Sequence, residues 1–324
     1  MNVTRMWIVC PSWKDVPSFT MLQARTREII EARPSDQRLE VRFVLVDDTA
    51  GTDESIAKLE ADGDVRVITP PFNLGHQRAI VYGLRTALPD IDDPDLIVTM
   101  DADGEDRPED IPRLIEPILA KPPDHRMLSI AQRTERKESL RFKVLYLFFR
   151  LMFRTLTGTT VRSGNFAGYR AFLAKRMLRH PYFDLCYSST LINIGIDITP
   201  VPCARGTRYE GQSRMNMLRL VMHGVRMLMP FTDRVAVRAL MAFSSVFGLG
   251  ILAALAVAGI RTFTNAAIPG WTTFTLLGML ILSFVALGNF IVLFAVFSHS
   301  RGVSLANLEV SNGRSPGGTP PTSD

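Results

Sequence analysis

Cysteine is scarce in this sequence, and acidic residues are scarce in part of it. Three cysteines occur in 324 residues, Cys10, Cys186 and Cys203, and none has the spacing of a metal site. An odd number of scattered thiols argues against a disulfide framework and indicates a reducing compartment. Residues 1–138 hold 18 Lys and Arg against 26 Asp and Glu, whereas residues 139–324 hold 19 against 6. The resulting charges of −8 and +13 suit metal binding in the first part and anionic headgroups or phosphates, rather than nucleic acid, in the second.

Two stretches lack charged residues altogether, Ala239 to Ile260 and Thr272 to Phe297. Each exceeds the roughly 20 apolar residues that a helix needs to cross a bilayer. We therefore expect two transmembrane helices within residues 236–298. Arginines flank this pair while the connector holds only Arg261, so the positive-inside bias predicts a multi-pass protein of the inner or plasma membrane with both termini in the cytoplasm. The N-terminal apolar stretch of about five residues is too short for the core of a signal peptide.

Two amphipathic segments precede these stretches, near residues 139–156 and 214–229. In each, basic side chains fall within one narrow sector of a helix and bulky apolar side chains fill much of the rest. This pattern predicts two helices that lie in the membrane interface. The alternative is a basic-edged helix on an ordinary soluble core. The composition of residues 299–324 predicts a disordered cytoplasmic tail.

The first 130 residues alternate between short apolar runs, rich in β-branched residues, and helix-like segments. The predicted strands are Met6–Cys10, Val41–Val46, Val65–Ile68 and Leu96–Met100, and the predicted helices are Phe19–Arg33, Asp53–Asp62 and Gln77–Ala87. Such alternation predicts an α/β fold with a mostly parallel sheet covered by helices. Ligands of open sheets bind at the carboxyl ends of the strands, so the polar residues that end these runs are the candidates for a site.

The strongest candidate is an acidic triplet that follows the last of these strands. Asp101, Asp103 and Glu105 occupy alternate positions, and alternate side chains of an extended segment point the same way. Carboxylate oxygens suit a hard divalent cation such as Mg²⁺ or Mn²⁺. Such an ion can bridge a diphosphate and neutralise charge on a departing nucleotide. The alternative, of about equal weight from the residues alone, is a solvated turn.

Two further polar groups follow strand-like runs. Asp47 and Asp48 end one run, and Asn73 and Gly75 follow the next and open a helix-like segment. One interpretation is a backbone that approaches a nucleotide-bearing ligand. The other is a local turn or helix N-cap at each place, for which Asp, Asn and Gly are favoured residues. The residues alone leave both interpretations open.

Taken together and in this order, the motifs resemble the membrane-anchored family 2 glycosyltransferases of GT-A fold, in particular the polyprenyl-phosphate glycosyltransferases that include dolichol-phosphate mannose synthase-like enzymes. The resemblance covers residues 7 to about 215 and extends to the two predicted transmembrane helices. It is carried by the following segments: Pro11-Ser12-Trp13-Lys14-Asp15, VLVDDTAGTDES, NLGHQRAIVYGLRTA, MDADGEDRPED, Arg133, and the stretch from Arg208 to Arg214.

The resemblance assigns roles to these residues. It implies nucleotide-sugar binding by Pro11, Trp13, Asp15, Asp47, Asp48, Asn73, Gly75 and Asp101; phosphate binding by Arg133, Arg208 and Arg214; metal binding by Asp101, Asp103 and Glu105; and catalytic roles for Asp103 and Arg208. The sequence departs from the family at Trp13 and Asp15, where the family has Tyr and Glu, and at Glu105, where it has Gln. Guanidinium groups suit phosphate oxygens because their forks donate two hydrogen bonds at once.

The function implied is the inverting, metal-dependent transfer of a sugar from a nucleotide sugar to a polyprenyl phosphate at the cytoplasmic membrane face. We expect a cytoplasmic GT-A catalytic domain over residues 1–235, with Mg²⁺ or Mn²⁺ as cofactor and membrane lipids as partners; homo-oligomers are left open. The alternatives are a glycosyltransferase for another lipid acceptor and a non-catalytic membrane-bound platform that keeps the fold.

The segment from Arg162 to Phe166 bears on the acceptor. Relatives place a loop with an Asp there, but this segment has no carboxylate, so no catalytic base can be assigned from the resemblance. An alcohol must lose a proton during attack and normally needs such a base. A phosphate monoester, with a second pKa near 6, is already largely a dianion at neutral pH. The missing carboxylate therefore favours a phosphate acceptor.

Overall fold

The computed structural model describes residues 5–34, 37–59, 62–133, 140–160, 163–210, 217–264 and 270–299. The chain divides into two compact units, Met1–Phe231 and Thr232–Asp324. The expected interfacial segment at 214–229 lies partly outside the described residues. The expected tail at 299–324 lies outside them after residue 299.

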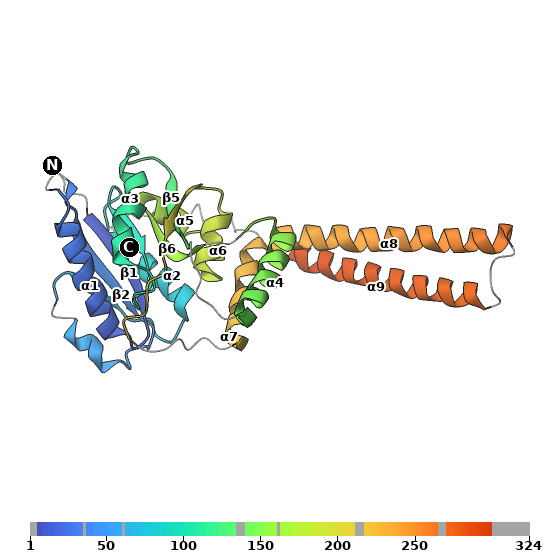
Figure 1. Ribbon diagram of the computed structural model, residues 1–324, viewed down its shortest axis with the longest axis horizontal. Coiled ribbons are helices and arrows are strands. Elements are labelled where there is room, and N and C mark those ends of the chain that lie inside the picture. Colours follow the sequence, from blue (N-terminus) through green and yellow to red (C-terminus); the bar gives the residue numbers. More distant parts are fainter. Residues whose placement is uncertain are drawn as a thin grey trace, which may run out of the picture. The chain divides into compact units, whose positions relative to one another are not determined.

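The first unit is built on a seven-stranded sheet (Figure 1). Its strands are β1 (Arg5–Ser12), β2 (Glu40–Asp47), β3 (Val65–Ile68), β4 (Leu96–Thr99), β5 (Met127–Arg133), β6 (Ser163–Arg170) and β7 (Asp197–Cys203), in the spatial order β3-β2-β1-β4-β6-β5-β7. Strand β6 runs antiparallel to β4 and β5, and all other pairs are parallel. The predicted α/β class with a mostly parallel sheet is confirmed.

Helices cover both faces of this sheet (Figure 1). The helices are α1 (Val16–Glu31), α2 (His76–Ala87), α3 (Ile111–Leu119), α4 (Leu140–Thr157), α5 (Ala171–Met177), α6 (Tyr187–Asn193) and α7 (Met217–Leu228), with 3₁₀ turns η2 (Glu54–Lys58), η3 (Leu88–Asp90), η4 (Pro108–Asp110), η5 (Pro181–Asp184) and η6 (Met229–Phe231). Alternate side chains of β1 enter opposite cores, since Ile8 packs with α1 and α3 while Val9 packs with α2, α5 and α6. Both faces of the central strands are therefore buried, as expected of a parallel sheet.

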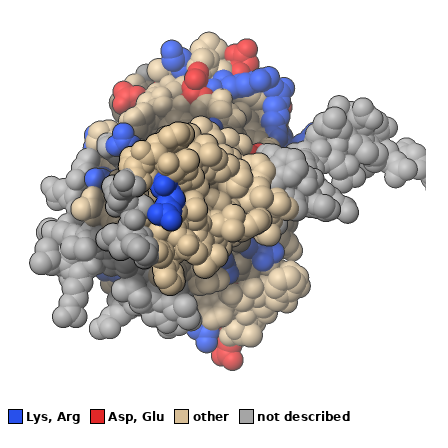
Figure 2. All heavy atoms as spheres, turned by 90° about the vertical axis from the view of Figure 1, so that its right-hand side faces the viewer, with Lys and Arg blue, Asp and Glu red and all other residues tan. Residues whose placement is uncertain are grey.

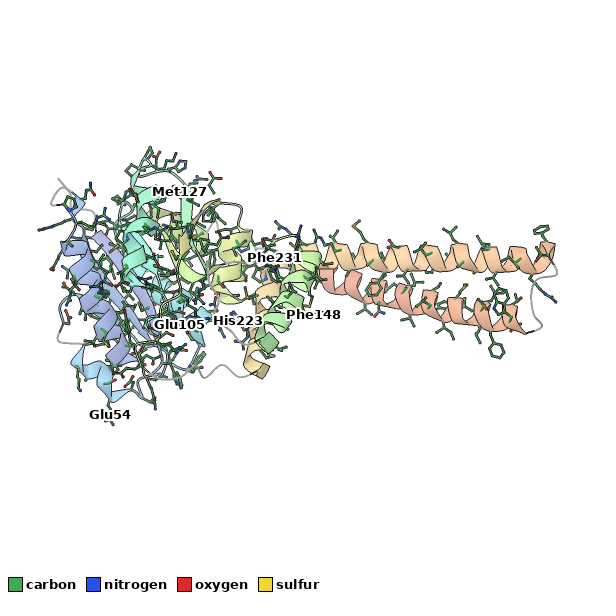
Figure 3. All side chains as sticks on the ribbon, viewed as in Figure 1. Glu54, Glu105, Met127, Phe148, His223 and Phe231 are labelled. Atoms are coloured by element: carbon green, nitrogen blue, oxygen red, sulfur yellow. The ribbon has the colours of Figure 1, made fainter. Side chains whose placement is uncertain are left out.

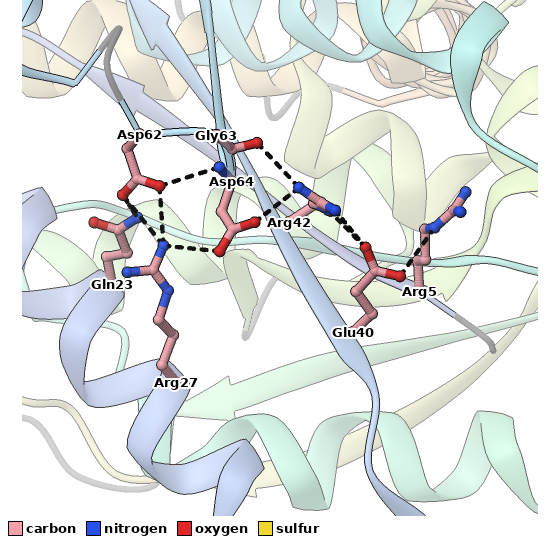
Figure 4. A network of polar contacts seen from close by, with 8 residues as sticks. All are labelled: Arg5, Gln23, Arg27, Glu40, Arg42, Asp62, Gly63 and Asp64. Carbon is pink, nitrogen blue, oxygen red and sulfur yellow. Dashed lines mark hydrogen bonds and ion pairs between the residues drawn. The ribbon is translucent and has the colours of Figure 1, made fainter.

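Ion pairs join the amino ends of the strands (Figure 4). Arg42 of β2 contacts Glu40 at 2.5 Å and Asp64 at 2.7 Å, and Glu40 also contacts Arg5 of β1 at 3.3 Å. Arg27 of α1 reaches Asp64 at 3.2 Å. These side chains are about one third to two fifths exposed, so each pair contributes at most about 1 kcal/mol. The charged side chains of Arg5, Glu40, Arg42 and Asp64, at the amino ends of the strands, thus pair with one another.

The second unit consists of helices α8 (Thr232–Phe263) and α9 (Trp271–His299), which pack against each other. Both are long and apolar enough to cross a membrane. Most of their large apolar side chains are exposed, including Leu249, Leu252 and Phe284 at 64–65%. Figure 2 shows a largely uncharged, tan surface facing the viewer, with a small group of Lys or Arg spheres near its centre. In water such a surface would favour aggregation, which agrees with the two membrane spans expected from the sequence.

Candidate functional site

The candidate site lies where the strand order reverses. From β1 the chain passes to β2 and β3 on one side and then returns to β4 on the other, so the loops after β1 and β4 diverge. In open α/β sheets this switch point forms a crevice outside the carboxyl ends of the strands. The loops that follow β1 and β4 carry Pro11 to Asp15 and Asp101 to Asp106. The fold therefore brings two of the motifs singled out in the sequence to one edge of the sheet.

Three carboxylates crowd the turn after β4. The side chains of Asp101, Asp103 and Asp106 are 19%, 10% and 5% exposed. Burial, with the charge of Asp101 second, raises the pKa of Asp103 to about 6 and also raises the pKa of Asp106. Burial alone would raise the pKa of Asp101 too, but His76 and Asn165 hold that pKa below its usual value. The turn thus concentrates negative charge in a place with little water, which is the electrostatic setting for a cation.

Asp101 is held by residues from two other elements. His76, the first residue of α2, places Nε2 3.0 Å from the carboxylate Oδ1. Asn165 of β6 donates from Nδ2 to the same oxygen at 3.1 Å and lies 2.5 Å from His76 Nε2. Gln77 in turn donates to Asn165 Oδ1 at 2.5 Å. Asn165 therefore positions Asp101. In the segment where relatives carry an Asp, this chain thus places the amide of Asn165 beside Asp101.

Arg133 and Arg208, which were predicted to bind phosphate, both contact carboxylates of the acidic turn. Arg208 Nη2 lies 2.7 Å from Asp103 Oδ2, and Arg208 Nε donates to Glu105 Oε1 at 3.1 Å. Arg133, at the end of β5, places Nη2 3.3 Å from Asp106 Oδ1. Burial would lower the pKa of Arg208, but Asp103 and Glu105 raise it. Both arginines are thus fixed, fully charged, beside the acidic turn.

Asp47 and Asp48 are engaged by backbone groups. Asp47 Oδ1 accepts from the backbone nitrogen of Thr49 at 3.0 Å, which closes a local turn. Asp48 accepts from the backbone nitrogens of Leu74 at 2.7 Å and Gly75 at 3.0 Å, so it ties the loop before α2 to the end of β2. Burial raises the pKa of Asp48 although these hydrogen bonds oppose the shift. Asp47 thus closes a local turn, whereas Asp48 joins two loops that are 26 residues apart in sequence.

Asn73 and Gly75 complete the same connection. Asn73 Nδ2 donates to the carbonyl oxygen of Asp48 at 2.8 Å and to its carboxylate at 2.9 Å. Gly75 has φ of 78°, a conformation that favours glycine, and is the N-cap of α2. The start of a 12-residue helix is thereby aimed at the same edge of the sheet.

The loop after β1 supplies the remaining predicted residues. Pro11 is buried within β1, while Trp13 is 42% exposed and Lys14 has φ of 58°. The charge of Asp15 is near enough to Arg208 to help raise the pKa of that guanidinium. Trp13 is thus a partly exposed aromatic residue of the loop that follows β1, and Asp15 of the same loop lies near Arg208. Arg214 lies outside the described residues.

A divalent metal was predicted at Asp101, Asp103 and Glu105. In the part of the chain that the structure describes, no group of three or more His, Cys, Asp or Glu side chains is placed to hold an ion. Glu105 instead directs Oε2 to Arg205 Nη2 at 2.5 Å and Oε1 to Arg208 Nε at 3.1 Å. Mg²⁺ is commonly held by one or two carboxylates together with substrate phosphates. The charge-rich pair Asp101 and Asp103 fits that pattern, whereas Glu105 does not join it here.

Sequence reasoning assigned no role to four residues of the site, namely His76, Gln77, Asp106 and Arg205. His76 and Gln77 stand directly after the Asn-x-Gly motif, and Asp106 stands directly after Glu105, so their positions were visible. Their partners were not visible, because Asn165, which contacts His76 and Gln77, and Arg133, which contacts Asp106, come from strands far along the chain. Only the sheet topology brings them together.

The family model described as glycosyl transferase family 2 matches residues 19–178. An undecaprenyl-phosphate 4-deoxy-4-formamido-L-arabinose transferase of Pectobacterium carotovorum subsp. carotovorum (strain PC1) is 26% identical over 299 residues, which are 89% of this chain and 87% of the relative. An uncharacterized glycosyltransferase of Bacillus subtilis (strain 168), YkcC, is 27% identical over 294 residues, covering 86% and 84%.

One solved structure of similar fold is the glucosyl-3-phosphoglycerate synthase from Mycobacterium tuberculosis, determined in complex with Mn²⁺, uridine diphosphate and phosphoglyceric acid. It aligns with a TM-score of 0.52 and 15% identity over 72% of this chain and 78% of that chain. At this level of identity the likeness concerns the fold alone, and it agrees with the GT-A architecture expected from the sequence.

Proposed function

The chain carries a glycosyl transferase family 2 domain and is a glycosyltransferase, and from this premise we propose that it transfers a sugar from a nucleotide sugar to a polyprenyl phosphate at a membrane surface. The observation that carries the proposal is the acidic turn with Asp101 and Asp103, faced by Arg208 and placed at the switch point of the sheet. The substrate class is taken from the Pectobacterium relative, which is an undecaprenyl-phosphate glycosyltransferase by name.

The acidic turn and its arginines suit a diphosphate leaving group. Asp101 and Asp103 would hold a divalent ion, which when bound neutralises charge on the diphosphate and assists its departure. Arg208 donates from a planar fork that fits phosphate oxygens. Asn165 and His76 orient the Asp101 carboxylate, as residues around a metal ligand commonly do. The proposed reaction is a single displacement that inverts the anomeric carbon.

The acceptor follows from what the chain places around Asp101. Asn165 is an amide, and its Nδ2 points at Asp101 Oδ1, 3.1 Å away, so it cannot take a proton from an alcohol. A polyprenyl phosphate is already ionised at neutral pH and needs positioning rather than deprotonation. The cationic groups beside the acidic turn, Arg133 and Arg208, are suited to this task.

An apolar surface on α4 and α7 supports placement at a membrane. The two helices pack through Phe149, whose ring lies 2.8 Å from where a Cβ on Gly224 would be. Large apolar side chains point outward from the pair: Leu147, Phe148 and Leu151 on α4 and Val221, Met222 and Val225 on α7. Phe148, labelled in Figure 3, is 65% exposed. We call these six residues the lipid-facing surface and propose that it enters the headgroup region, since Arg150 and Arg226 on the same helices suit anionic lipids.

The orientation in the membrane is part of the proposal. With arginines before α8 and few basic residues between α8 and α9, the first unit and both termini would lie in the cytoplasm, over residues 1–235 and 299–324. This is the compartment that supplies nucleotide sugars to such a reaction.

The test is transfer by the full-length protein in nanodiscs of anionic lipid. We would supply a panel of UDP- and GDP-sugars, undecaprenyl phosphate and Mn²⁺, detect the glycosyl phosphoryl lipid by mass spectrometry, and assign the anomeric configuration by NMR. The expected product has the configuration opposite to that of the donor and is absent for Asp103→Asn. Equal transfer to undecaprenol, which has no phosphate, would contradict the proposed acceptor, and a retained configuration would contradict the single displacement.

A further inference from the structure

The segment that follows β7 is fixed along the acidic turn. Residues 204–210, which we call the arginine strap, run beside the loop that follows β4. The backbone nitrogen of Gly206 donates to the carbonyl oxygen of Glu105 at 2.9 Å, and that of Tyr209 donates to the carbonyl oxygen of Asp103 at 2.9 Å. Two main-chain hydrogen bonds therefore align the strap with residues 103–105.

Two glycines permit this close approach. Gly104 has φ of 87°, and a Cβ there would lie 2.8 Å from the ring of Tyr209. A Cβ on Gly206 would lie 2.2 Å from the carbonyl oxygen of Gly104, closer than real contacts allow. Because this nearest atom belongs to the backbone, it cannot move aside as the end of a flexible side chain could. The contact between strap and turn is thus specified by the sequence of both segments.

Glu105 lies at the centre of this contact and is labelled in Figure 3. Its Oε2 is 2.5 Å from Arg205 Nη2, and its Oε1 accepts from Arg208 Nε at 3.1 Å. The Glu105 side chain is 13% exposed, against 34% for Arg205 and 30% for Arg208. A shielded carboxylate between two partly exposed guanidinium groups holds their positions more firmly than a surface pair would.

We infer that Glu105 is a positioning residue, which holds Arg205 with one carboxylate oxygen and with the other fixes the guanidinium group of Arg208 so that it presents donors to a phosphate group of a substrate, and that it is not a metal ligand. The inference rests on the proposed function, since it assumes phosphate-bearing substrates. Arg208 uses Nε and Nη2 on carboxylates, and a guanidinium group has five N–H donors, so these contacts leave donors for a phosphate oxygen.

The phosphate can belong to the donor diphosphate or to the acceptor monoester, and both offer the same oxygens. The residue type at position 105 helps to decide whether Glu105 is a metal ligand or a residue that positions the arginines. Gln at this place, as in the resembling family, cannot form two ion pairs with arginines, whereas Glu105 forms both. The carboxylate therefore gives this chain a fixed arginine pair that an amide would hold more weakly.

The experiment is a double-substitution cycle on the full-length protein in detergent, combining Glu105→Gln with Arg208→Lys. Binding of UDP and of GDP is followed by tryptophan fluorescence, because Trp13 is 42% exposed beside the site, and Mn²⁺ is titrated at fixed nucleotide. The KM for undecaprenyl phosphate, measured separately, distinguishes the acceptor from the donor as the source of the phosphate. Asp103→Asn serves as the reference for loss of a metal ligand.

A positioning role predicts three results. The Mn²⁺ concentration for half-maximal nucleotide binding stays within about twofold of wild type in Glu105→Gln, whereas Asp103→Asn raises it at least about tenfold. Arg208→Lys weakens the phosphate-bearing substrate about tenfold in the wild-type background, since a point charge replaces a fork. In the Glu105→Gln background the same change costs less than about threefold, because the fork is no longer fixed.

Two results would overturn the inference. One is a rise of the Mn²⁺ requirement in Glu105→Gln as large as in Asp103→Asn, which would make Glu105 a ligand. The other is an equal cost of Arg208→Lys in both backgrounds, which would reduce the Glu105 contacts to a structural role. The binding measurements need no acceptor, so failure of the proposed transfer reaction would be seen separately, as nucleotide binding without a lipid product.

Discussion

Replacing Asp103 by Asn should stabilise the folded protein while it abolishes transfer. The Asp103 side chain is 10% exposed, and Asp101 is the nearby charge that most disfavours its ionised form after burial itself. Asn has nearly the same shape and no charge. The substitution therefore removes a buried like-charge conflict that we attribute to function, since sites of this kind are commonly less stable than the rest of a fold.

The magnitude follows from the pKa of Asp103, which rises from 3.8 to about 6 on folding. At pH 7 the ionised side chain then costs about 3 kcal/mol of folding free energy, because one pKa unit corresponds to about 1.4 kcal/mol. Because the pKa of Asp103 is raised in the folded protein, this cost is absent below about pH 4, where the side chain is protonated in both states. The folding free energy becomes less favourable as pH rises through about 6 and the buried side chain ionises. The attraction of Arg208, whose Nη2 lies 2.7 Å from Asp103 Oδ2, already lowers the pKa of Asp103 and is therefore contained in this cost. We expect Asn to raise the stability by up to about 3 kcal/mol, or up to roughly 12 °C in Tm.

The assay is thermal unfolding in detergent with EDTA at pH 7, together with the transfer assay. At a hundred times its Kd, Mn²⁺ should raise the free energy of unfolding of wild type by about 2.7 kcal/mol, and the Tm should increase accordingly. The Tm of Asp103→Asn should hardly change. Asp95→Asn is the matched control: Asp95 is 3% exposed at the other end of the strands and accepts from Arg5 N and Trp7 Nε1, both at 3.1 Å. That variant should lose stability and keep activity. A lower Tm for Asp103→Asn with wild-type transfer would refute the reasoning.

Three further outcomes are expected. The double substitution Phe148→Asp and Leu151→Asp should release the protein's first unit from anionic lipid. The KM for polyprenyl phosphate should then rise about tenfold while the affinity for the donor stays unchanged. An equal loss of donor affinity would contradict the role proposed for the lipid-facing surface. Asp48→Asn should lower stability by about 1 to 3 kcal/mol in thermal unfolding although it removes a buried charge, because both carboxylate oxygens accept hydrogen bonds from the loop and an amide would turn one of them into a donor that faces a backbone N–H of Leu74 or Gly75. An unchanged Tm would show that the loop is held otherwise. Transfer should increase with pH through about 6 as the acceptor phosphate ionises, and a flat profile measured at saturating donor would argue against that step.

Much of the fold was predictable because local pattern and tertiary burial agree. The strand expected at Val65–Ile68 is β3 with the same limits, and the helix expected at Gln77–Ala87 is α2, which begins one residue earlier. The helix expected at Asp53–Asp62 is shorter, a 3₁₀ turn over Glu54–Lys58. Of the described residues of this segment, Ile56 and Leu59 are the ones that reach the core, and Asp53 accepts from Ser55 N, so its side chain closes a local turn.

The site was predictable in its acidic residues and not in their partners. Asp101 and Asp103 stand out because an apolar strand leads directly to them. The contact of Glu105 with Arg205 joins residues 100 apart in sequence, and that of Asn165 with Asp101 joins residues 64 apart. No periodicity encodes such pairs, since they depend on the antiparallel β6 beside β4 and on the return of the chain after β7. The sequence thus identified Asp101 and Asp103 and, through the resemblance, Arg133 and Arg208, but not which carboxylate each arginine contacts.

The balance of charge around the turn bears on what the site can process. Arg133, Arg205 and Arg208 each contact one or more carboxylates of the turn, yet burial and mutual repulsion still raise the pKa of Asp103 and Asp106. The arginines therefore do not neutralise the turn on their own, and a divalent ion would complete the balance. Once such an ion shares the carboxylates, the same arginines would become more available to phosphate oxygens. An arrangement of this kind, with fixed cations and an amide where a base would stand, suits a reaction in which both the leaving group and the nucleophile are phosphates.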